Sequence, residues 1–235
     1  MNSNRRTAMI VGILYIIGTV TGVLSVVFTK SILDAPDYLV KTAASPNQII
    51  IGALFVLTMG VALAIVPVVI FPVLKKHNEV LALGYVVFRG ALEMVGYMAT
   101  TTCFLLIVAL SQAAMQVGAV DVANFQVLGD LVQRANEVSV TIGGIIFPLG
   151  ALMLYTAFYQ SKLIPRWISV WGILAIVLFM ATAFLDMFGL VGQMSTIQTV
   201  LALPIALQEM VMAVWLIVKG FNPTAIGSGF ATSGI

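Results

Sequence analysis

The chain has 235 residues, of which 61% are hydrophobic and only 9% are charged, against about 25% charged residues in an ordinary soluble domain. Its mean hydropathy of +1.11 is typical of a protein whose surroundings are mostly lipid, and runs of about 20 apolar residues, each long enough to cross a bilayer, recur along it. The formal net charge of +2 comes from basic residues scattered at the ends of these runs, which argues against nucleic acid as a partner.

Six membrane-spanning helices are predicted, forming one all-α integral membrane bundle over residues 1–222. The apolar part of the first helix, about 21 residues, is longer than the h-region of a signal peptide, so this helix is expected to be retained. The third exceeds the thickness of the bilayer core and is expected to tilt or project from it. The expected helices cover residues 8–28, 49–74, 80–110, 131–159, 167–189 and 199–218, followed by a flexible, Gly/Ser-rich tail over residues 223–235.

The loops predict the orientation. With the N-terminus inside, most lysines and arginines of the loops fall on the cytoplasmic side, in agreement with the positive-inside rule. Both termini are therefore expected in the cytoplasm, and the tryptophans of KLIPRWISVWG (residues 162–172) are expected to lie at the headgroup boundary. The inner residues are Arg5, Arg6, Lys75, Lys76, Lys162, Arg166 and Lys219, and the outer ones are Lys30, Lys41 and Arg134.

The usual signatures of soluble enzymes are missing. Cys103 is the only cysteine and His77 the only histidine, which excludes an intramolecular disulfide and a multi-histidine metal site. The chain contains no GxSxG, HExxH, Walker A or GxGxxG motif. We therefore assign no catalytic residue, metal or cofactor from the sequence.

Charged residues nevertheless lie inside the apolar runs. Arg89 and Glu93 are four residues apart in the third predicted helix, Glu137 lies in the fourth and Glu209 in the sixth. Each belongs to a stripe of small or polar residues spaced three and four apart, which places the stripe on one helix face. Small residues let membrane helices approach closely, so the three stripes are expected to face one shared interior.

Depth and charge predict how these residues pair. Arg89 and Glu209 are each ten residues from the cytoplasmic end of their helix, or about 15 Å deep. An unpaired charge near a helix centre costs roughly 2.5–3.5 kcal/mol, and a guanidinium keeps its proton. Arg89 is therefore predicted to bridge Glu93 and Glu209. Because two carboxylates outnumber one guanidinium, one glutamate is expected to hold a proton, and Glu137, further out, is a separate candidate for proton binding.

Three functions agree with this pattern. In the first, the cluster binds or transports a small molecule or ion: Arg89 attracts an anionic group, the glutamates handle protons or cations, and helix movement occurs at Gly143, Gly144, Pro148 and Pro204. Six helices make a small transporter, so a homodimer is considered. In the second, the protein is a non-catalytic interaction or regulatory subunit that contacts membrane lipids or another membrane protein, and its charges are structural. The third and least favoured is an intramembrane enzyme on a lipid-like substrate, with a glutamate as general acid or base.

Three segments resemble a known family. The segments RRTAMIVGILYIIGTVTGVLS (residues 5–25), KLIPRWISVWGILA (162–175) and QEMVMAVWLIVKGF (208–221) are similar to the bacterial multi-pass membrane proteins of the domain-of-unknown-function family numbered 4386. The resemblance covers roughly residues 5 to 222, and its last segment, which contains Glu209 and Lys219, is the most specific. It implies a protein of six or seven helices in the bacterial inner membrane, without an assigned activity.

Overall fold

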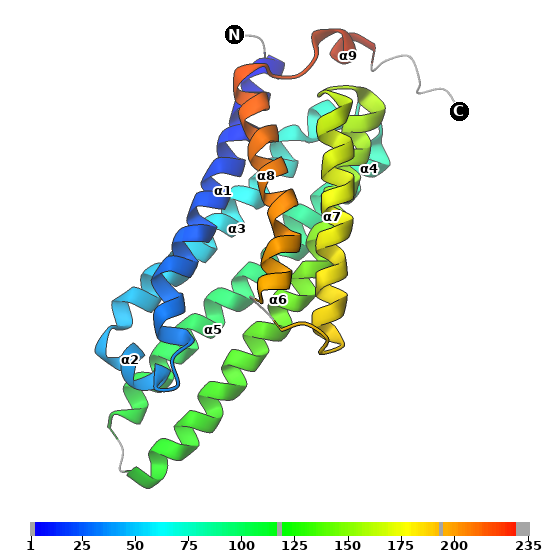
Figure 1. Cartoon of the computed structure of the whole chain (residues 1–235). Helices are drawn as coiled ribbons and strands as arrows, with labels where there is room; N and C mark the ends of the chain where they lie inside the picture. Colours follow the sequence, from blue (N-terminus) through cyan, green and yellow to red (C-terminus); the bar gives the residue numbers. More distant parts are fainter. Residues whose placement is uncertain (1–2, 117–118, 193–194, 229–235) are drawn as a thin grey trace. The chain divides into compact units, whose positions relative to one another are not determined.

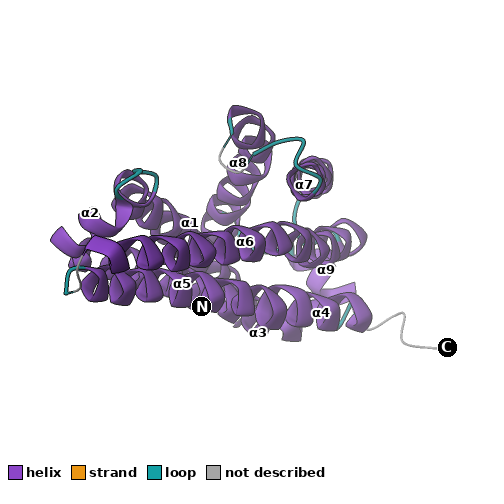
Figure 2. Ribbon diagram, turned by 90° about the horizontal axis from the view of Figure 1, so that it is seen from below, coloured by secondary structure: helices purple, strands orange, loops and turns teal. Residues whose placement is uncertain are grey.

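A computed structural model describes residues 3–116, 119–192 and 195–228, and within these ranges every regular element is a helix (Figures 1 and 2). The all-α fold predicted from the sequence is therefore confirmed. In the described residues, six helices are long and apolar enough to cross a membrane, as the sequence predicts. The chain is a multi-pass membrane protein.

All of the spanning helices except α7 (Arg166–Met187) are longer than hydropathy alone predicts. The first spanning helix is α1 (Ser3–Leu33) and the second is α3 (Pro46–Leu74). The third is one continuous rod made of α4 (Glu79–Tyr85), a π-helical segment η1 (Val86–Leu92) and α5 (Glu93–Ala114). The last three are α6 (Ala119–Ser161), α7 (Arg166–Met187) and α8 (Thr196–Val218), and two short helices, α2 (Tyr38–Ala44) and α9 (Pro223–Ser228), were not expected.

The largest difference is at the start of α6, which begins at residue 119 and not near residue 131. Hydropathy detects solubility in lipid, whereas helix formation requires only internal backbone hydrogen bonds and suitable residues. Where a helix continues into polar residues, a prediction from hydropathy therefore makes the helix shorter than it is. Part of the expected tail, residues 223–228, forms α9, and residues 229–235 lie outside the described residues.

The chain divides into two compact units. The first comprises Met1–Ile17, Ala62–Met94 and Thr141–Ile235. Its core contains large side chains that are fully buried, including Tyr15, Tyr85, Tyr155, Phe158 and Ile168, and within it α7 packs along α8 (Figure 1).

In this unit the start of α1 lies beside the end of α8 (Figure 1). The Arg5 guanidinium donates to the carbonyl oxygens of Leu216, Ile217 and Val218 at 3.0, 2.6 and 3.0 Å. These carbonyls belong to the last turn of α8, where the helix itself supplies no donor and a cation is favourable. Arg5 therefore caps α8 from another helix, and the start of α1 and the end of α8 lie at the same end of this unit.

The second unit comprises Gly18–Val61 and Val95–Val140. Its apolar core is formed by Ile32, Ile49, Ala53, Val56, Phe104 and Val108. The buried Tyr38 of α2 donates a hydrogen bond of 2.9 Å to Asp130 Oδ1 of α6. Burial, together with this donated bond, raises the pKa of Tyr38 above its usual value, so the hydroxyl keeps its proton and remains a donor.

Candidate functional site

The site begins with an irregularity in the third spanning helix. Arg89 lies in η1, where the backbone hydrogen bonds widen: the Glu93 N–H donates to the Phe88 carbonyl, five residues back. Such π segments are rare in α-helices and frequent at functional sites. The wider turn changes the directions in which the following side chains point, and no residue pattern in the sequence predicts it.

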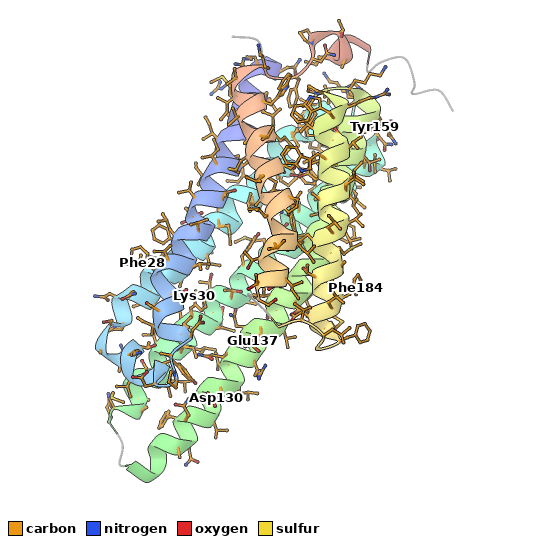
Figure 3. All side chains as sticks on the ribbon, viewed as in Figure 1. Phe28, Lys30, Asp130, Glu137, Tyr159 and Phe184 are labelled. Atoms are coloured by element: carbon orange, nitrogen blue, oxygen red, sulfur yellow. The ribbon has the colours of Figure 1, made fainter. Side chains whose placement is uncertain are left out.

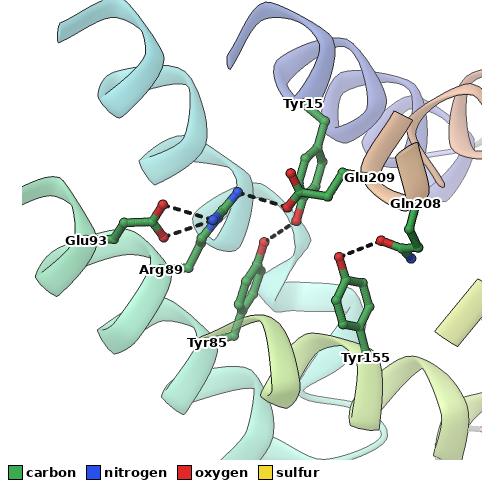
Figure 4. Close-up of polar contacts among 7 residues, drawn as sticks. All are labelled: Tyr15, Tyr85, Arg89, Glu93, Tyr155, Gln208 and Glu209. Atoms are coloured by element: carbon green, nitrogen blue, oxygen red, sulfur yellow. Dashed lines mark hydrogen bonds and ion pairs between the residues drawn. The ribbon is translucent and has the colours of Figure 1, made fainter. Parts of the chain in front are cut away.

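Three charged side chains meet at this point (Figure 4). Arg89, only 3% exposed, donates through Nη1 to both carboxylate oxygens of Glu93 at 2.9 and 3.0 Å. Its Nη2 donates to Oε1 of Glu209 on α8 at 3.2 Å. The predicted bridge between the two glutamates is therefore confirmed. The two carboxylates differ: the Glu93 side chain is 5% exposed and that of Glu209 is 14% exposed.

Aromatic rings enclose the guanidinium. The Phe147 ring of α6 lies with its centroid 4.4 Å from Arg89 Cζ, and the Tyr15 ring of α1 lies at 5.7 Å. Aromatic faces attract cations, most strongly where water is excluded. Tyr15 and Tyr85 join their hydroxyls at 2.9 Å beside the cluster (Figure 4). The charges are thus surrounded by side chains from four spanning helices.

A second polar link lies next to the charges. The Tyr155 hydroxyl donates to Oε1 of Gln208 at 2.7 Å (Figure 4). Gln208 Nε2 in turn donates to the Ile168 carbonyl of α7 at 3.0 Å. Gln208 is fully buried, and both ends of its amide are therefore satisfied. It holds α8 against α6 and α7 at the residue that precedes Glu209.

Sequence reasoning found only part of this surrounding shell. The stripe predicted on the fourth helix runs from Glu137 through Pro148 and Ala151 to Tyr155, but Tyr85 and Gln208 were missed. Weak signals for both existed, since Tyr85 is four residues before Arg89 and Gln208 is adjacent to Glu209. Tyr15 and Phe147 carry no such signal, because an aromatic residue in an apolar helix is ordinary packing.

Close backbone packing completes the cluster. A Cβ atom added to Gly150 of α6 would lie 3.0 Å from the backbone nitrogen of Arg89 and 3.2 Å from its Cβ. A backbone atom cannot move aside as a flexible side-chain tip can. Gly150 therefore lets α6 approach η1 closely enough to place Phe147 against the guanidinium.

We expect Gly150→Ala to lower the free energy of unfolding by about 1–3 kcal/mol, through overpacking against Arg89. Gly143→Ala is the matched control in the same helix, because nothing lies within 4 Å of its added Cβ; it should be neutral or stabilise by up to about 1 kcal/mol, since alanine favours helix. Reversible denaturation in detergent micelles measures both. Equal effects of the two substitutions would contradict the packing argument.

Glu137 belongs to the other compact unit. There its half-exposed carboxylate contacts Arg134 Nη1 at 2.7 Å (Figure 3). The two residues are three apart on α6, so they pair locally on one exposed helix face. Glu93 and Glu209 lie together in the first unit, and a role of Glu137 in proton binding stays a prediction.

The glycines and prolines assigned to helix movement lie within continuous helices. Helix α6 runs through Pro148 and α8 through Pro204. Gly144 has a packing role, because its added Cβ would lie 2.9 Å from Ala183 Cβ of α7. Whether these positions move remains a prediction. Over the described ranges, no group of three His, Cys, Asp or Glu side chains is placed to hold a metal ion.

Comparison with known proteins identifies one relationship. The family model described as "Domain of unknown function (DUF4386)" matches residues 10–220, which is most of the chain and includes every residue of the Arg89 cluster. No curated protein and no solved structure matches the chain.

Proposed function

The chain belongs to the DUF4386 family, and from that premise we propose that it binds or transports a small molecule or ion through the Arg89–Glu93–Glu209 cluster. The observation that carries the proposal is one buried guanidinium shared by two carboxylates from different spanning helices. Ionisable residues inside a membrane are costly to keep and commonly mark ion or substrate pathways.

The charge of the cluster supports a role in binding. One guanidinium and two ionised carboxylates sum to one negative charge, which a low-dielectric interior opposes. A proton or a small cation completes the balance. A singly charged anionic solute that replaced a carboxylate on Arg89 would reach the same balance only if both glutamates took up protons.

The unequal contacts of the two carboxylates support Glu209 as the exchangeable partner. Glu93 holds Arg89 with two short contacts inside one helix, whereas Glu209 makes one contact of 3.2 Å from another helix and is more exposed. Pro204 lies five residues before Glu209 in α8 and removes one backbone hydrogen bond there. We infer that Glu209 and the adjoining part of α8 move when a ligand or proton binds.

The remaining assignments belong to the same proposal. We place the protein in the inner membrane of a bacterial cell with both termini in the cytoplasm, on the strength of the basic loops. A homodimer would provide the larger assembly that a transporter of this size requires.

Native mass spectrometry of the purified protein in nanodiscs tests the proposal. We expect a small species bound to the wild type to be lost from Glu209→Gln, because the amide keeps the side chain's shape but removes its charge. Glu137→Gln, the control outside the cluster, should retain the species. Thermal melts of all three should agree within a few degrees. A wild type with no bound species, or a species retained by Glu209→Gln, would count against this function.

The tight packing of the cluster favours a second candidate, in which the ion pairs only hold the helices in register. Gly150 approaches the Arg89 backbone and Phe147 covers the guanidinium, an arrangement that suits a fixed structural element. In that case replacing all three charges by apolar residues of similar size would preserve folding and cellular function. Loss of function with retained stability would favour the binding role.

A further inference from the structure

A second polar feature lies at one end of the first unit, apart from the Arg89 cluster. Two turns, one between α6 and α7 and the other between α8 and α9, line a cavity of about 590 Å³. Its wall includes Lys162, Arg166 and Lys219, together with Trp215 and Phe221, and no acidic residue. The size suits a small polar group with room for part of an attached chain.

The basic side chains have no acidic partner in the described part of the chain. Lys162, Arg166 and Lys219 are all exposed, and none of the ion pairs among the described residues involves them. Arg166 instead lies over the Tyr159 ring, with its Cζ 4.8 Å from the ring centroid. A cavity lined by three cations without a carboxylate favours an anion.

The backbone around the cavity is held in place. Asn222 donates its N–H to the Leu163 carbonyl at 2.9 Å and its side-chain amide to the Lys162 carbonyl at 3.5 Å. Lys162 has a φ of +56°, a left-handed conformation that usually belongs to glycine at the end of a helix. A lysine there costs stability that glycine would avoid, and this lysine is one of the residues that line the cavity.

The start of α7 adds to the positive field. Arg166 is its first residue, and Pro165 before it makes no side-chain cap. The backbone N–H groups of the first turn of a helix point toward its N-terminal end, which lines the cavity here. Trp167 and Trp171 stack at this end with centroids 6.3 Å apart, and Trp167 is exposed. Tryptophans are enriched at the level of the lipid headgroups.

We propose that this cavity binds a phosphate group at the membrane surface. Three basic side chains, a helix N-terminus and an adjacent tryptophan pair provide the charge and the depth that an anionic lipid headgroup requires. A free phosphate ion offers the same chemistry from a different source. The site lies on the side that the basic loops assign to the cytoplasm.

Native mass spectrometry in nanodiscs separates the two sources. The probes are phosphatidylglycerol mixed into phosphatidylcholine, and inorganic phosphate added to phosphatidylcholine alone. The choline ammonium is repelled by the basic cavity, so net headgroup charge decides retention. The variant is Lys162→Gln with Lys219→Gln. Its matched control is Lys75→Gln with Lys76→Gln, which removes the same charge from the same predicted side but outside the cavity. Tryptophan-fluorescence melts verify folding.

We expect the wild type and the control to retain phosphatidylglycerol and the cavity variant to retain at least fivefold less, which supports a lipid headgroup. Retention of inorganic phosphate by wild type and control, with the same loss in the variant, supports a free phosphate. Retention of neither probe by the wild type overturns the proposal, whatever the folding of the variant. An equal loss from both lysine pairs also overturns it, because the attraction would then be general surface charge.

Discussion

Replacing Arg89 by methionine is expected to lower the free energy of unfolding by about 3–5 kcal/mol, the usual cost of removing one partner from a buried ion pair. Methionine fills much of the same space, so the loss is chiefly electrostatic. Glu93 and Glu209 would face each other without a cation, in a site where the guanidinium is 3% exposed in the native protein. Denaturation in detergent micelles measures the change.

Two further variants identify the cause of this loss. Arg134→Met breaks a pair whose arginine side chain is 79% exposed, and it should cost less than about 1 kcal/mol. Adding Glu93→Gln and Glu209→Gln to Arg89→Met removes the uncompensated charge and should recover most of the stability. If Arg89→Met costs no more than Arg134→Met, the cluster does not contribute to stability through its charges.

Removing Glu93 should cost more than removing Glu209. Glu93→Ala eliminates two short charge-assisted hydrogen bonds, whereas Glu209→Ala eliminates one longer bond from a more exposed side chain. At about 1.5–3 kcal/mol for a hydrogen bond to a charged group, we expect about 3 kcal/mol for Glu93→Ala and about half of that for Glu209→Ala. Unfolding curves of the two variants, recorded at one pH and in one detergent, provide the comparison.

The order of these two costs bears directly on function. A carboxylate that contributes less to stability can leave Arg89 at a lower cost, which is the property required of an exchangeable partner. If Glu209→Ala proves as destabilising as Glu93→Ala, Glu209 is a fixed structural contact and the proposed exchange loses its basis. The comparison does not depend on identifying the ligand.

The fold follows from local properties of the chain. Long apolar runs indicate spanning helices because lipid offers backbone groups no other hydrogen-bond partner. The bridge from Arg89 to Glu93 and Glu209 was predictable for a related reason: helix geometry sets the spacing and the depth, and a buried guanidinium requires an anion. The short helix α2 and the early start of α6 were not predicted, because neither is needed to satisfy backbone groups or charges inside the lipid.

Thus the sequence by itself determined the fold class, the six spans and the residues that had to be paired, since each depends on local periodicity and on the cost of charge in lipid. Only the tertiary structure decided the rest: the π segment at Arg89, the approach of Gly150, the ring of Phe147 and the local pairing of Glu137 with Arg134. These features depend on which helix faces meet. Helix packing is set by many weak contacts between distant segments, and no single residue pattern in the sequence predicts it.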